Sequence, residues 1–212
     1  MAKRRNVGIC AMCGKTRKLS LEHVPPKGCF PKPRPTPLPI YTCKACNVES
    51  SVEDEHLKAF IGATATQYSP KGRGLQDDFF RTISHNKKLL RKILSGEFSE
   101  TVVDENGNKK PGVIGLKWDT RALVPLWNKM ARCLYFHNYQ EVLPEGVFMD
   151  PPIAQMKPDF NENLIDLLQC GSVGHSEEFQ FGLIREIKGE KMKFHCEMVF
   201  WGRMRVDASG GN

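Results

Sequence analysis

Two Cys-x-x-Cys pairs constrain the fold of this 212-residue chain more than any other feature. The first pair is Cys10 and Cys13, and the second is Cys43 and Cys46. Four thiolates complete the tetrahedral shell of a structural zinc ion, and two pairs can supply them only if the fold brings the pairs together. A redox site uses a single pair, so thiol redox chemistry is kept as the alternative. We predict a structural Zn²⁺ site made of these four cysteines.

The compartment bears on this interpretation of the cysteines. The chain starts with MAKRRNVGIC, in which basic residues are not followed by an apolar stretch of signal-peptide length. No apolar run approaches the roughly 20 residues that are needed to span a bilayer. We therefore expect a cytoplasmic protein without a membrane partner, in which thiols stay reduced and a disulfide framework is not expected.

Positive charge is concentrated in the first 50 residues. They hold ten Lys and Arg side chains against two acidic ones, whereas the other 162 residues are close to neutral within a total of +7. A basic block of this kind attracts polyanions and makes their binding depend on salt. A solvated basic surface is the simpler explanation, so the charge alone does not decide for nucleic acid.

A proline-rich stretch, PPKGCFPKPRPTPLP, separates the two cysteine pairs and holds seven of the 14 prolines. Proline cannot sit inside a helix or a central strand without losing hydrogen bonds, so an extended, semi-rigid loop is expected. Lys27, Lys32 and Arg34 lie in this loop, and we predict that they bind nucleic acid through its phosphates. The alternative is a spacer that lets the second cysteine pair return to the first.

Hydrophobic periodicity predicts an α+β fold in two domains, with residues 1–66 forming a zinc-binding module and residues 67–212 forming an α+β accessory domain of unknown role. We expect three helices followed by C-terminal antiparallel strands in the accessory part. The expected strands of the module cover residues 19–24 and 40–42. Helices are expected from residue 51, over 77–94 and over 123–138; further strands flank an Asn-Gly turn at 106–107 and a turn at 188–190.

The module resembles the zinc-containing HNH endonucleases, whose active site is a ββα-metal fold. The resemblance rests on Glu22-His23-Val24-x-Pro26 between the two cysteine pairs and on Asn47 directly after Cys46, and it covers residues 10 to about 60. It implies that His23 is the general base that activates water. It also implies that Glu22 and Asn47 hold a catalytic Mg²⁺ or Mn²⁺ ion, and that the substrate is DNA, with RNA as a second possibility.

The chain departs from the family pattern in two places. The loop between the expected strands contains no Asn to orient His23, and Val48 and Glu49 follow Asn47 where the family often has Lys or His. His56 is the candidate for the remaining histidine of the family motif, and a solvated position on a helix is its alternative role. These departures leave a second hypothesis from a different class, a zinc-ribbon protein that binds nucleic acid without catalysis.

Overall fold

The computed structural model describes residues 7–48, 51–64, 73–95, 97–103, 106–116, 120–144, 148–149, 153–156, 169–174, 178–202 and 204–211. Within these ranges, none of the helices is long and apolar enough to cross a membrane. The N-terminal basic residues Lys3, Arg4 and Arg5 lie outside the described part of the chain.

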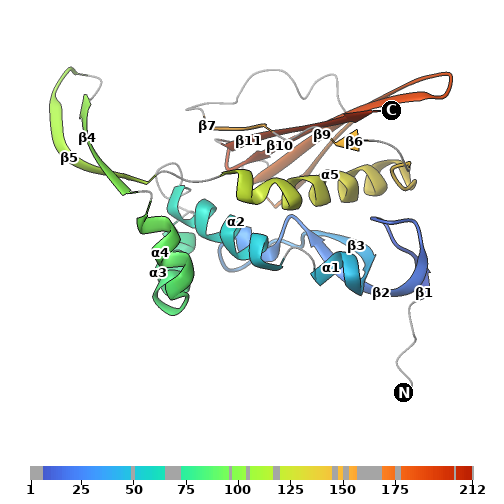
Figure 1. The fold of residues 1–212 in the computed structure, drawn as a ribbon, viewed down its shortest axis with the longest axis horizontal. Helices are drawn as coiled ribbons and strands as arrows, with labels where there is room; N and C mark the ends of the chain where they lie inside the picture. The colour runs from blue at the N-terminus through green and yellow to red at the C-terminus, as the bar shows by residue number, and fades with distance from the viewer. Residues whose placement is uncertain are drawn as a thin grey trace.

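The N-terminal module is a small antiparallel sheet followed by two helices (Figure 1). Strands β1 (Val7–Ile9), β2 (Thr16–Val24) and β3 (Leu38–Cys43) lie in the order β1-β2-β3. Helices α1 (Lys44–Val48) and α2 (Ser51–Thr64) follow directly. Both expected strands are therefore confirmed, each longer than the hydrophobic pattern indicated. The proline-rich stretch contains one 3-10 turn at Lys27–Cys29 and is otherwise irregular until its last two residues, Leu38 and Pro39, which begin the edge strand β3.

Two helices take the place of the single helix expected over residues 77–94. These are α3 (Arg73–His85) and α4 (Lys87–Leu94), so that expectation was wrong. The break lies at Asn86, whose side-chain oxygen accepts a hydrogen bond from the Leu89 N–H at 2.9 Å. Asn is among the best residues for capping a helix N-terminus in this way. The Asn86 amide also donates to Glu55 of α2 at 2.9 Å, which holds the break against the neighbouring helix.

The C-terminal part is an antiparallel sheet covered on one face by a helix (Figure 1). A separate hairpin of β4 (Glu97–Val103) and β5 (Lys109–Leu116) precedes helix α5 (Val124–Tyr139). The sheet has the order β6-β11-β10-β9-β8, with β7 also paired to β11. Its strands are β6 (Phe148–Met149), β7 (Ile153–Met156), β8 (Gln169–Val173), β9 (Phe179–Lys188), β10 (Lys191–Phe200) and β11 (Met204–Gly211). The two predicted hairpins are confirmed, whereas β11 was not expected.

Helix α5 lies between the C-terminal sheet and the N-terminal module (Figure 1). Its Trp127 ring packs against Phe200 with centroids 5.8 Å apart, and Tyr135 meets Phe194 edge-on at the same separation. One buried hydrophobic cluster includes these residues and also Val24 and Phe30 of the module. The fold class is thus α+β, as predicted. The division of the chain at residues 66 and 67 stays a prediction.

Candidate metal centre and phosphate site

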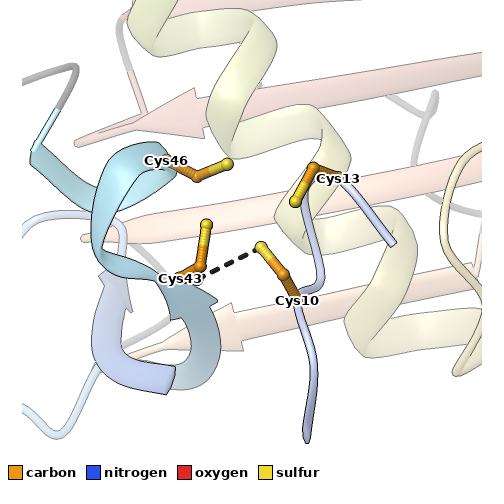
Figure 2. A group of neighbouring side chains, drawn as sticks. All are labelled: Cys10, Cys13, Cys43 and Cys46. Carbon is orange, nitrogen blue, oxygen red and sulfur yellow. Dashed lines mark hydrogen bonds between the residues drawn. The ribbon is translucent and has the colours of Figure 1, made fainter. Parts of the chain in front are cut away.

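The four cysteines of the two pairs meet at one point (Figure 2). Their sulfur atoms all lie within 4.8 Å of one another. Sulfurs bound to one tetrahedral zinc ion at about 2.3 Å stand roughly 3.8 Å apart, so the arrangement fits zinc. Cys43 and Cys46 come from the end of β3 and from α1, and Cys10 and Cys13 come from the turn between β1 and β2. The structure thus brings together the predicted four-cysteine group.

Electrostatics in the cluster favour a bound cation. Burial raises the pKa of Cys10, but hydrogen bonds to its sulfur, the largest from the Cys43 N–H at 3.2 Å, outweigh burial and lower its pKa to about 7. Burial and the neighbouring thiols raise the pKa of Cys46 instead. Four adjacent thiolates repel one another unless a metal ion neutralises them, and metal binding then stabilises the fold. The site is closed by four protein ligands, which is the arrangement of structural rather than catalytic zinc.

Glu22 and His23 point to opposite faces of β2, because the strand continues regularly through Val24. Strand β2 ends immediately before Pro25 and Pro26, as the two prolines indicated. The Glu22 side chain is buried toward α5, whereas His23 is half-buried on the other face. One hydrogen bond links the two residues locally, since the His23 N–H donates to Glu22 Oε1 at 3.3 Å.

His23 lies in a hollow together with the three predicted phosphate-binding residues. The hollow has a volume of about 570 Å³ and is walled by the proline-rich loop and by the ends of β2 and β3. Lys27, Lys32 and Arg34 all line it beside His23. Arg34 is also held 3.6 Å from Asp78 of α3, so its charge is partly balanced. Residues that the sequence placed in one loop therefore surround the proposed general base.

The environment of His23 favours the neutral form of its imidazole. Burial lowers its pKa below the ordinary histidine value, the positive charge of Lys27 lowers it further, and Glu22 opposes both effects. A neutral imidazole can accept a proton from water, so this shift suits a general base. In the described part of the chain, no side chain donates or accepts a hydrogen bond at the His23 ring, in line with the absence of an orienting Asn in the loop.

A lysine from the C-terminal part occupies the other side of β2. Lys129 of α5 donates a hydrogen bond to Glu22 Oε2 at 2.8 Å, and both side chains are buried. The same ammonium lies 3.4 Å from the backbone carbonyl of Asn47. Glu22 and Asn47, the two residues predicted to bind a divalent cation, are thus adjacent in the fold and share an ammonium ion.

The side chains of Glu22 and Asn47 are poorly suited to bind a divalent cation. The Asn47 amide nitrogen donates to Ser20 Oγ at 2.9 Å and to the Leu21 carbonyl at 3.4 Å. The Glu22 carboxylate is neutralised by Lys129, and a hard cation would have to displace that ammonium to gain an oxygen ligand. In this arrangement, Glu22 and Asn47 therefore do not form a cation site that could take part in catalysis.

Sequence reasoning missed Lys129. Its neighbours Trp127, Met130 and Ala131 are buried on the face that anchors α5, and a lysine beside such positions is unusual unless an acidic group pairs with it. That pattern could have identified Lys129 as a paired residue. It could not have identified Glu22 as the partner.

A second cluster of potential ligands lies on the C-terminal sheet, where His195, Glu197 and Asp207 have their ligand atoms within 4.8 Å of one another. The Nε atom of Arg205 lies 3.3 Å from Oε1 of Glu197. The same guanidinium donates hydrogen bonds from Nε and Nη2 to Asp207 Oδ1, at 3.0 and 2.9 Å. The guanidinium supplies the positive charge that a metal ion would bring. His56, outside both clusters, lies in α2.

Comparisons of this chain with protein-family models, with curated proteins and with solved structures found no match.

Proposed function

We propose that this protein is a cytoplasmic nuclease of the HNH type, which binds DNA at the basic hollow and hydrolyses a phosphodiester bond with His23 as the general base. The observation that carries the proposal is that His23 shares one hollow with Lys27, Lys32 and Arg34. Cationic side chains around a phosphodiester hold it in place and favour the negative charge that develops in the transition state. RNA has the same phosphodiester chemistry and is the second substrate to be tested.

The zinc site has a structural role in this proposal. Cys10 and Cys13 precede β2, Cys43 ends β3 and Cys46 lies in α1 just after it, so one ion ties together the two ends of the hairpin that carries His23. Zinc held by four thiolates has no open position for substrate or water. Loss of zinc is therefore expected to abolish activity through loss of the fold of the module.

The catalytic Mg²⁺ or Mn²⁺ ion that the resemblance implies at Glu22 and Asn47 takes no step in this proposal, because Glu22 points away from the hollow and its carboxylate is paired with Lys129. In this chain its binding competes with Lys129, whose ammonium lies against both residues. Cleavage with an added divalent ion, compared with cleavage without one, decides whether the ion takes part.

A nicking assay on supercoiled plasmid tests the proposal. Wild-type protein of known zinc content is incubated with Mg²⁺, with Mn²⁺ and without added divalent ion, beside His23→Ala and the control His85→Ala. His85 is exposed on α3, outside the hollow. We expect His23→Ala to lose about 10²- to 10⁴-fold in rate, the usual contribution of a general base, and His85→Ala to cleave like the wild type. Absence of nicking under all three conditions would sink the proposal.

A non-catalytic nucleic-acid-binding protein is the second candidate, and one observation favours it. Lys129 neutralises Glu22, the carboxylate that the nuclease would need for its cation. This candidate predicts binding of nucleic acid that weakens steeply with salt, without hydrolysis under any divalent ion. A filter-binding titration at several salt concentrations, on the same protein samples, separates it from the nuclease.

A further inference from the structure

Two large apolar side chains are exposed beside the basic hollow. Tyr41 of β3 is 47% exposed and Leu21 of β2 is 44% exposed. They are direct cross-strand partners in the antiparallel pair of β2 and β3, so both point to the same face of the sheet. Val7 and Ile9 of β1 are also exposed, but they pair with Lys18 and Thr16 on the opposite face of the sheet. Leu21 and Tyr41 therefore form the exposed apolar pair on the face that carries His23.

The exposed pair continues directly into the hollow that contains His23. Leu21 itself lines the hollow, and so does Pro39, which lies opposite His23 in the same pair of strands. Tyr41 and His23 are therefore diagonal neighbours, at a spacing of about 7–8 Å between their backbone positions. An aromatic ring lies within one residue pair of the proposed general base.

Positive charge surrounds the pair on both sides. Lys27 and Lys32 line the hollow beyond His23. Arg17 lies on β2 four residues before Leu21, on the same face because side chains alternate along the strand, and it is exposed. An exposed aromatic ring between cationic groups is the arrangement by which proteins bind single-stranded nucleic acid: bases stack on the ring, and cations follow the backbone.

We propose that Tyr41 is a base-stacking site and that the preferred ligand is single-stranded nucleic acid, whose phosphates lie in the hollow beside His23. In a duplex the faces of the bases are covered by their neighbours, so a tyrosine on an open sheet gains a stacking partner only from an unstacked base. This inference rests on the proposed binding of nucleic acid at the hollow. It adds the class of substrate to that proposal.

The test measures binding separately from cleavage. Fluorescence anisotropy is recorded with the full zinc-loaded chain, without added divalent ion, on labelled oligonucleotides of about 15 nucleotides, a length within reach of known single-strand site sizes. The probes are single-stranded DNA, single-stranded RNA and the corresponding DNA duplex. Tyr41→Thr keeps a residue suited to a strand, Tyr41→Phe keeps the ring, and Ile187→Thr removes a comparably exposed side chain on β9 as the control.

We expect the wild type to prefer a single strand to the duplex. Tyr41→Thr is expected to weaken single-strand binding by roughly 5- to 140-fold, the loss of one stacked base, while Tyr41→Phe and Ile187→Thr bind like the wild type. Because Tyr41 carries no charge, the salt dependence of Tyr41→Thr stays that of the wild type. Lys32→Ala is expected to reduce the log–log salt slope by about 0.7, the value for one phosphate contact on a single strand.

Other outcomes overturn the inference. Wild-type affinity in Tyr41→Thr, with unchanged zinc content, removes Tyr41 from the binding surface. Duplex binding as tight as single-strand binding refutes the class of ligand, and so does the absence of binding to all three probes. The nicking assay is read independently, so a chain that cleaves plasmid but ignores Tyr41→Thr loses this inference and keeps the proposed function.

Discussion

The Nζ atom of Lys129 lies 2.8 Å from Oε2 of Glu22, across 107 residues of sequence. The pair joins helix α5 to strand β2, and its two side chains are 5% and 8% exposed. A buried ion pair contributes little net stability compared with an apolar pair, but removing one partner leaves the other charge uncompensated in a poorly solvated place. The contact therefore holds the N-terminal module in one position on α5.

Lys129→Met is expected to lower the free energy of unfolding by about 3–5 kcal/mol, because it leaves the Glu22 carboxylate buried without its counter-charge. The measurement is equilibrium unfolding in urea at neutral pH. Lys193→Met, on an exposed position of β10, serves as the matched control and is expected to change stability by less than about 0.5 kcal/mol.

The double variant Glu22→Gln/Lys129→Met keeps this prediction testable if Lys129→Met does not fold. It removes both charges and is expected to recover most of the lost stability. A double variant as unstable as Lys129→Met alone would show that the lysine acts through packing and not through its charge.

Zinc binding is expected to require all four cysteines of the cluster. Cys46→Ser is expected to reduce the zinc content measured by elemental analysis and to lower the melting temperature, because the remaining ligands hold the ion more weakly. Cys196→Ala, a buried thiol on β10 outside the cluster, is the control and is expected to keep its zinc. A wild-type protein that carries no zinc and has one pair of reactive thiols would support the redox alternative instead.

The titration of His23 is expected to respond to Lys27. Burial and the charge of Lys27 place the His23 pKa below the ordinary value, so removing that charge in Lys27→Ala raises the pKa. Proton NMR titration of the imidazole measures this directly. Since the neutral ring is the proposed base, cleavage should fall as pH drops through the His23 pKa, and in Lys27→Ala this fall should begin at higher pH.

Lys193→Ala is the control for the titration, because Lys193 lies on β10 and does not line the hollow. An unchanged His23 titration in Lys27→Ala would mean that Lys27 is screened by solvent at this distance. A cleavage profile that does not follow the His23 titration would remove His23 from the role of base.

Asp54→Asn is expected to stabilise the protein at neutral pH. Burial raises the pKa of Asp54 to about 6, helped by Glu22 and Glu53 and opposed by Lys129, and its Oδ1 atom has no hydrogen-bond partner among the described residues. Between about pH 4 and pH 6 the Asp54 carboxyl therefore keeps its proton in the folded protein and has lost it in the unfolded chain. Stability therefore falls as pH rises from about 4, the unfolded value, to about 6.

The expected gain for Asp54→Asn is about 1–2 kcal/mol at pH 7.5, after allowance for partial screening by solvent. It should shrink at about pH 5, where Asp54 in the folded wild type is mostly protonated. Urea unfolding at the two pH values measures the difference. Equal gains at both would contradict an origin in ionisation.

Local sequence patterns determined the features of the fold that depend only on residues close together in the chain, such as turns, strand ends and helix caps. The spacing of Cys10, Cys13, Cys43 and Cys46 predicted the metal cluster because each pair forms its own turn, and the two strands between the pairs return the second turn to the first. Pro25 and Pro26 end β2, and alternating apolar residues predicted the hairpin of β9 and β10. The break at Asn86 was also a local signal, a helix cap that periodicity alone overlooked.

Only the tertiary structure determined which distant residues these elements contact and which of their side chains stay exposed. Lys129 reaches Glu22 because α5 packs between the C-terminal sheet and the module, and no local pattern encodes which carboxylate meets that lysine. The same holds for Tyr41, whose exposure beside His23 follows from the register of β2 against β3. Spacing and periodicity are set by neighbours in the chain, whereas charge partners and exposed faces are set by packing between segments that are distant in sequence.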